Sequence, residues 1–307
     1  MSRLLFALFL SATPALAEAP RVVTDLPLTQ SLVAGVLGEG ATVTALLDRG
    51  ADPHHAQLRP SQARALSGAD LVVWIGPGLS PWLAGPLDSL AGGRVLDLSA
   101  VPGLHTQDFA AEEHDDHGHD DHDHDHDDHG HDHSGMDPHL WLEPGNVALW
   151  QRALGTALAE ADPENAAEYT TRAEAAAVGT EALRAEIEAI LAPVGDAGLV
   201  MFHDAYGYFA HAFGLNVVAN ISGGDASAPG AARIAALRAE LQQDRAVCLF
   251  PEANHADDFA RVVAEGTTLR IGAPLDPAGM GLEPGPDLYA RLMRALAQSI
   301  ADCVTAG

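Results

Sequence analysis

Histidine is the residue type in this chain that is best suited to chemistry, because neutral imidazole is the commonest metal ligand in proteins. The 307 residues include 16 histidines, of which seven are scattered and nine are interleaved with nine aspartates in residues 112–133. The nine clustered histidines are His114, His117, His119, His122, His124, His126, His129, His131 and His133. Because such a segment cannot build an apolar core, we predict a disordered loop over 112–136.

Three scattered histidines and one aspartate lie close to the predicted ends of strands or to the end of the His-rich segment. His54 and Asp276 each follow a β-rich run, His203 closes another, and His139 comes directly after the His-rich segment. Ligands in open α/β sheets bind beyond the carboxyl ends of strands, so we expect these four side chains to converge on a cleft. Three imidazoles and one carboxylate suit zinc, which typically takes four ligands, whereas manganese sites carry more carboxylate oxygen.

The other polar residues near these positions have weaker claims to bind metal. His55 adjoins His54, and neighbouring residues rarely point into one tetrahedral site, so we expect it to be exposed. Glu252 and His255 follow a predicted strand and could support the cleft, since ligating histidines commonly donate their second N–H to a carboxylate. For His255 a position on a surface loop is at least as consistent with the sequence. We assign His105 and His211 to the surface or to packing.

The elements that must position these residues alternate between strands and helices, which is typical of βαβ units with parallel sheets. The predicted strands cover residues 22–25, 42–47, 70–75, 94–98, 199–203, 216–218, 246–250 and 268–271. The predicted helices between and after them cover residues 27–37, 61–66, 80–90, 205–213, 229–242, 257–265 and 286–302. The fold class is therefore α/β, with two lobes that each contain a small, mainly parallel sheet flanked by helices.

A long helix is predicted between the two lobes. Asp162 and Pro163 form a helix start, and the following residues are rich in Ala, Glu and Arg until Pro193. Thirty helical residues would span roughly 45 Å, which indicates a stiff connector. The predicted division is a signal peptide at 1–17, an N-terminal lobe at 18–145, a short helix at 146–161, the connecting helix at 162–193 and a C-terminal lobe at 194–307.

The N-terminus has the pattern of a secretory signal peptide. Arg3 supplies the positive region, residues 4–10 are apolar, and Ala15 and Ala17 form an A-x-A cleavage site. The alternative is a membrane anchor, but seven apolar residues are too few to span a bilayer. No cysteine adjoins the cleavage site, so we do not expect a lipid anchor. We predict a soluble, exported protein whose mature part begins near Glu18.

Export favours a disulfide between the two cysteines, Cys248 in an apolar strand and Cys303 at the end of the last helix. The loop-entropy relation gives such a bond, closing about 55 residues, roughly 4 kcal/mol of stability before strain. The alternative is a cysteine metal site, which two isolated cysteines serve poorly.

The charge and the missing motifs exclude several function classes. All 16 cationic residues are arginine, and with 43 acidic residues the net charge is −27. Nucleic-acid binding needs a basic face, and a chain without lysine has no Walker A loop and no Schiff-base lysine. Neither an H-E-x-x-H helix nor a G-x-S-x-G elbow is present. We therefore expect a binding protein rather than an enzyme.

Four segments together resemble a known family, the metal-binding proteins of bacterial ABC importers. These segments are GADPHHAQLRPS (50–61), DPHLWLEPGN (137–146), FHDAYGYFA (202–210) and IGAPLDP (271–277). The acidic, His-rich insertion before the second segment is similar to that of the ZnuA-type zinc-uptake branch. The resemblance covers essentially the whole mature chain.

The resemblance implies two four-stranded lobes joined by a rigid helix, with one metal ion held between them. His54, His139 and His203 match the three histidine ligands, and the histidine at 203 favours zinc over manganese. Asp276 matches a carboxylate that is the fourth ligand in relatives, although water can take that place in zinc proteins. The implied partners are Zn²⁺ and an ABC permease with its cytoplasmic ATPase, and we expect a monomer.

Alternatives remain at this point for the whole protein and for its loop. The protein could be a periplasmic zinc buffer, an adhesin, or a secreted zinc hydrolase with Glu252 as general base. For the loop we favour a zinc-capturing antenna or a second, weaker metal site, because the carboxylates concentrate cations near it. A solvated charge run without a specific role is the alternative.

Overall fold

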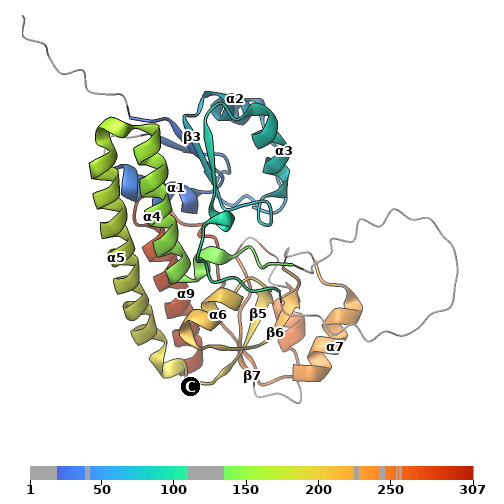
Figure 1. The fold of residues 1–307 in the computed structure, drawn as a ribbon. Coiled ribbons are helices and arrows are strands. Elements are labelled where there is room, and N and C mark those ends of the chain that lie inside the picture. Colours follow the sequence, from blue (N-terminus) through green and yellow to red (C-terminus); the bar gives the residue numbers. More distant parts are fainter. Residues whose placement is uncertain are drawn as a thin grey trace, which may run out of the picture.

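The structure is a computed structural model that describes residues 19–38, 42–109, 135–224, 228–241, 246–253, 255 and 258–306. Two lobes lie one above the other in Figure 1. The predicted signal peptide and all nine clustered histidines lie outside the described residues.

The N-terminal lobe is a parallel sheet with the strand order β2-β1-β3-β4. Short, apolar and β-branched runs form its two central strands, which are buried along their whole length. Its elements are β1 (Val22–Thr24), α1 (Pro27–Leu37), β2 (Val43–Ala45), α2 (Pro60–Gly68), β3 (Leu71–Trp74), α3 (Pro81–Leu90) and β4 (Arg94–Asp97). Each of the three helices begins with proline, which suits the first helical turn.

The C-terminal lobe is a second parallel sheet with the order β6-β5-β7-β8. Its central strand β5 ends at His203 and is buried throughout. Its elements are β5 (Gly198–His203), α6 (Gly207–Phe213), β6 (Asn216–Ser222), α7 (Ala231–Leu241), β7 (Ala246–Leu249), α8 (Asp258–Ala264), β8 (Arg270–Ile271) and α9 (Leu288–Thr305). Together the two sheets confirm the predicted two-lobe α/β class.

Two antiparallel helices join the lobes, α4 (Pro144–Ala161) and α5 (Ala166–Leu191). Helix α5 packs against α4 and touches both α1 and α9, and in Figure 1 it runs beside both lobes. Regular helix begins at Ala166, later than the sequence indicated. The Asp162 carboxylate accepts the Tyr169 hydroxyl at 2.8 Å and the side-chain amide of Asn165 at 2.7 Å. A 3₁₀ turn (Pro163–Asn165) precedes α5 and another (Ala192–Val194) follows it.

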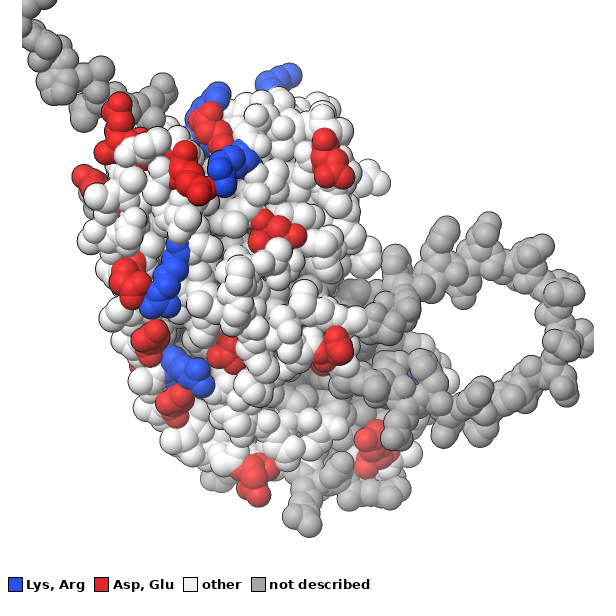
Figure 2. All heavy atoms as spheres, in the orientation of Figure 1, with Lys and Arg blue, Asp and Glu red and all other residues white. Residues whose placement is uncertain are grey.

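The outer face of this helical layer is charged. Arg152 of α4 binds Glu174 of α5 at 2.8 Å, and Arg294 of α9 binds Glu186 of α5 at 2.7 Å. Figure 2 shows basic and acidic residues side by side along the edge that α5 forms. Within the described residues, no helix combines the length and the apolar character needed to cross a membrane.

The largest buried cluster is continuous through both lobes. It includes Val73 of β3, Trp150 of α4, Ile187 of α5, Met201 of β5 and Leu292 of α9. Two smaller clusters lie on the other faces of the sheets, one in each lobe. The lobes therefore share one core on the side of α4, α5 and α9.

A disulfide joins Cys248 of β7 to Cys303 of α9, with their Cα atoms 6.3 Å apart. The predicted pairing is confirmed. The bond attaches the last helix, which belongs to the shared core, to a strand of the C-terminal sheet.

Candidate metal centre

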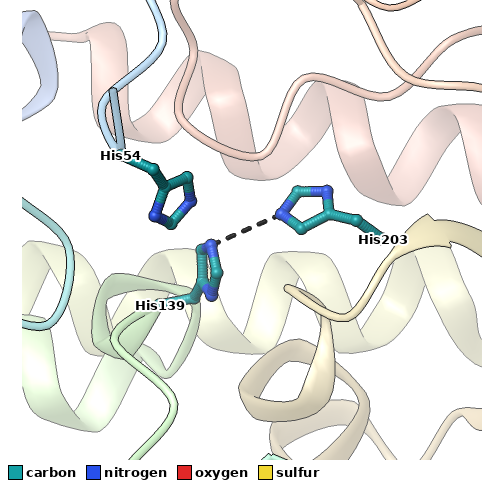
Figure 3. Close-up of side chains that lie close together, drawn as sticks. All are labelled: His54, His139 and His203. Carbon is teal, nitrogen blue, oxygen red and sulfur yellow. Dashed lines mark hydrogen bonds between the residues drawn. The ribbon is translucent and has the colours of Figure 1, made fainter. Parts of the chain in front are cut away.

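Three of the four predicted ligands lie together between the lobes. One nitrogen each from His54, His139 and His203 can be chosen so that all three lie within 4.8 Å of one another, and Figure 3 shows the three rings turned toward a common point. The Nε2 atoms of His139 and His203 are 3.5 Å apart. Two nitrogens at tetrahedral positions on zinc, with Zn–N bonds of about 2.0–2.1 Å, would be separated by about 3.3 Å.

The three histidines lie in three different kinds of local structure. His54 lies in the loop after β2, His139 directly precedes the 3₁₀ turn Leu140–Leu142, and His203 is the last residue of β5. His139 and His203 are buried, whereas His54 is half-buried. A cavity of about 240 Å³ adjoins all three and is lined from both lobes.

A buried carboxylate orients His139. Asp137 Oδ1 lies 2.7 Å from the ring Nδ1 of His139 and also accepts the backbone N–H of His139 at 2.9 Å. Gln107 donates to the other carboxylate oxygen at 3.3 Å. When Nδ1–H donates to Asp137, the lone pair of the ring is on Nε2, which faces His203. Burial raises the pKa of Asp137 to about 7, against the smaller opposing effect of these hydrogen bonds.

Glu252 orients His203 as Asp137 orients His139, through a carboxylate at the ring Nδ1. Its carboxylate contacts the Nδ1 atom of His203, and both side chains are buried. Glu252 also pairs with Leu275 through an isolated β-bridge, which fixes its backbone. The predicted supporting place of Glu252 agrees with this contact. His255 lies farther out, 31% exposed, with its Nε2 3.7 Å from Glu252.

His54 is held through its backbone rather than through its ring. Asp52 accepts the backbone N–H of His54 at 2.8 Å. The carbonyl of the preceding Pro53 accepts the indole N–H of Trp82 at 2.9 Å, which ties this loop to α3. The ring of His55 lies outside the group, 54% exposed and 2.9 Å from Asp52, as its adjacency to His54 indicated.

Protonated imidazole is disfavoured at His54 and His139. Desolvation, followed by the neighbouring imidazoles, lowers the pKa of His54 to about 3 and the pKa of His139 well below its usual value. Metal ligation requires neutral imidazole. At neutral pH these two imidazoles are therefore already neutral and can bind a cation without losing a proton.

Asp276 lines the same cavity but does not join the group of three. Its two carboxylate oxygens accept the backbone N–H groups of Met280 at 3.0 Å and of Gly281 at 2.7 Å. The role of Asp276 as a fourth ligand stays a prediction.

The remaining histidines pair elsewhere. The rings of His105 and His211 stack with centroids 4.0 Å apart, and His211 lies 3.3 Å from the buried Glu143. This contact agrees with their predicted packing or surface role.

Two residues of the centre were missed by the sequence reasoning, Asp137 and Trp82. Asp137 carries a usable signal, because an aspartate two residues before a histidine can accept both the backbone and the ring N–H of that histidine. Trp82 carries none, since its contact with Pro53 depends on how α3 packs.

Comparisons with known proteins agree with this geometry. Residues 22–303 match the family model described as ZnuA, zinc-uptake complex component A, periplasmic. The high-affinity zinc uptake system protein ZnuA of Paracoccus denitrificans is 47% identical over 314 residues, covering 98% of this chain and 96% of that protein. The protein of the same description from Brucella suis biovar 1 is 38% identical, covering 94% of this chain and 92% of its own length.

A solved structure shares the fold. The crystal structure of ZnuA superposes with a TM-score of 0.76 at 22% identity and covers 94% of this chain and 100% of its own. The match with the family model spans both lobes and the helices that join them. The chain belongs to the family of periplasmic zinc-uptake complex component A proteins.

Proposed function

We propose that this protein binds one zinc ion tightly between its lobes and delivers it to an ABC permease for import. The proposal rests above all on one observation, the convergence of His54, His139 and His203 on a single point. Two of these imidazoles have a carboxylate at Nδ1, which leaves Nε2 free to ligate. Three neutral nitrogens and a fourth position, held by Asp276 or water, make a site suited to zinc.

The family supports a proposal for the location and the partners of the protein. Relatives are named high-affinity zinc uptake system proteins, and the family model is described as periplasmic. We propose an exported, periplasmic monomer whose partners are the permease and its cytoplasmic ATPase. The segment with nine histidines would collect zinc and raise its concentration near the cleft.

A binding role needs no turnover. Glu252 was the one attractive general base for a hydrolase, but its carboxylate contacts His203. This contact gives Glu252 a ligand-orienting role, so we expect no hydrolysis of esters, amides or lactams.

Zinc titration of the full chain against a competing chelator tests the proposal. His139→Ala and His203→Ala should each remove the tight site while leaving weak binding by the His-rich segment. His211→Ala is the matched control, because His211 is 57% exposed and stacks on His105 outside the group. A tight site that survives both His139→Ala and His203→Ala would contradict the assignment.

A further inference from the structure

A set of polar contacts crosses the rim of the cleft between the lobes. The backbone N–H of Gly50 donates to the carbonyl of Met280 at 3.1 Å. The guanidinium of Arg49 donates to the carbonyl of Gly281 at 2.6 Å and lies 2.5 Å from the carboxylate of Glu283. We call these five residues the rim clasp. Arg49 and Gly50 belong to the loop that carries His54, and the other three belong to the C-terminal lobe.

The C-terminal half of the clasp is a fixed turn. The carboxylate of Asp276 accepts the N–H groups of Met280 and Gly281, and the carbonyl of Asp276 accepts that of Gly279 at 3.3 Å. The Met280 side chain is buried and lines the metal cavity. The carbonyl groups that face Arg49 and Gly50 are therefore held in place from inside the cleft.

The N-terminal half is a short loop with two anchors. On one side of His54, Trp82 and Ser80 donate to the carbonyl of Pro53 at 2.9 and 3.4 Å. On the other side the loop turns at Gly50, whose φ of +74° favours glycine, and is joined there to the other lobe. The distance from His54 to the two buried histidines depends on both anchors.

We propose that Arg49 is a positioning residue for the bound ion. Through the rim clasp it holds the His54 loop against the C-terminal lobe and slows the release of zinc. This inference rests on the proposed zinc-binding function. His54 is the half-buried ligand of the three, so it is the one whose departure opens the site.

The size of the effect follows from the exposure of the contacts. Arg49 and Glu283 are 43% and 77% exposed, and an ion pair of this kind contributes little alone. Removing the Arg49 side chain would break this ion pair and the hydrogen bond to the carbonyl of Gly281. The loss of both corresponds to about a threefold to tenfold faster dissociation of zinc. The association rate should stay unchanged, because encounter does not depend on the clasp.

The test measures zinc dissociation from the full chain loaded with one equivalent of zinc, after mixing with excess chelator. Arg49→Met should accelerate dissociation by that factor, and Arg49→Lys should restore part of the difference. Arg59→Met is the matched control, because Arg59 follows His54 by as many residues as Arg49 precedes it and pairs with Asp48 in its own lobe at 2.8 Å. The unfolding temperature of the metal-free protein should be the same for all three variants.

A second variant keeps the test decisive. Glu283→Gln changes only an exposed side chain, and it should accelerate dissociation less than Arg49→Met and add little when combined with it. The inference is overturned if Arg49→Met leaves the dissociation rate within about twofold, or if Arg59→Met accelerates it equally. Loss of the tight site in His203→Ala together with unchanged dissociation in Arg49→Met would reject the clasp and keep the proposed function.

Discussion

A histidine ligates a metal only through a nitrogen that carries no proton, and the protein fixes that nitrogen at His139 and His203 by pairing their Nδ1 atoms with Asp137 and Glu252. The burial of Asp137 opposes its charge and raises its pKa to about 7. In the metal-free protein Asp137 therefore takes up a proton as the pH falls through 7. A protonated Asp137 no longer requires Nδ1–H on His139, which weakens the preference for the ligating form.

Asp137→Asn should separate charge from hydrogen bonding at this position. The amide oxygen still accepts Nδ1–H, but the charge is lost, so we expect zinc affinity at pH 8 to fall by about 10- to 100-fold. In the parent protein affinity should decline as the pH falls below about 7. The variant cannot take up that proton, so its decline between pH 8 and 6 should be shallower. Chelator competition at several pH values measures both effects.

The control for this prediction is Glu174→Gln, the same chemical change in an exposed ion pair on α5. It should leave affinity and its pH dependence unchanged. Equal slopes for the parent and Asp137→Asn would show that Asp137 does not carry this proton. His54 does not complicate the measurement, because its pKa of about 3 lies well below this range.

Residue types and strand ends indicated His54 and His203, and the place of His139 directly after the His-rich segment indicated the third histidine, but none of these signals found the groups that orient them. His54 and His203 are recognisable because ligands gather where parallel strands end. The contact between Glu252 and His203 joins residues 49 positions apart, and only the packing of β7 beside β5 brings them together. Asp276 was expected among the ligands, yet its oxygens bind the backbone of its own turn in this structure.

At the scale of elements, the two helices that join the lobes contain glycines in opposite surroundings. A Cβ at Gly179 of α5 would meet no atom within 4 Å. A Cβ at Gly155 of α4 would lie 2.5 Å from the Cβ of Ala173, where the two helices touch. Gly155 therefore permits the close approach of α4 and α5, whereas Gly179 only adds flexibility to a helix interior.

Alanine at these two positions should change stability in opposite directions. Gly179→Ala should raise the free energy of unfolding by up to about 1 kcal/mol through helix propensity. Gly155→Ala should lower it by about 1–3 kcal/mol, because overpacking forces the helices apart. Urea unfolding of the metal-free protein measures both. A stabilising Gly155→Ala would mean that the α4–α5 contact is looser than described.

Most elements were predictable because their boundaries carry local signals. Helix α1 covers residues 27–37 as expected, since Pro27 begins it and Gly38 ends it. Strand β6 continues to Ser222, beyond the predicted residue 218, because its pairing with β5 extends it past the polar Asn220. Such an extension depends on a neighbouring strand and has no signal in the strand's own sequence.

For the whole molecule, the core that both lobes share should make them unfold as one cooperative unit. Buried residues of both sheets contact α4, α5 and α9, and the disulfide ties α9 to β7. We therefore expect zinc binding to order the cleft loops more than it moves the lobes.

Calorimetry of the metal-free protein should then show a single unfolding transition. Ile187→Ala, which removes a fully buried side chain of α5 from the shared core, should lower the temperature of the whole transition, since such truncations cost about 2–5 kcal/mol. Two separate transitions in the parent, or a split caused by Ile187→Ala, would show that the lobes unfold independently.

The two sheets repeat one strand order, with the second strand of each lobe at the edge, the first beside it, and the third and fourth following. In topology the chain is thus a tandem pair of similar units facing each other. Two of the histidines come from non-equivalent places in that pair, His54 from the loop after the second strand of one unit and His203 from the end of the first strand of the other. His139 comes from the segment before α4. The centre thus lies at an interface between two non-identical units of a single polypeptide. Neither unit holds it alone, so separating the units would abolish the centre even with every histidine intact.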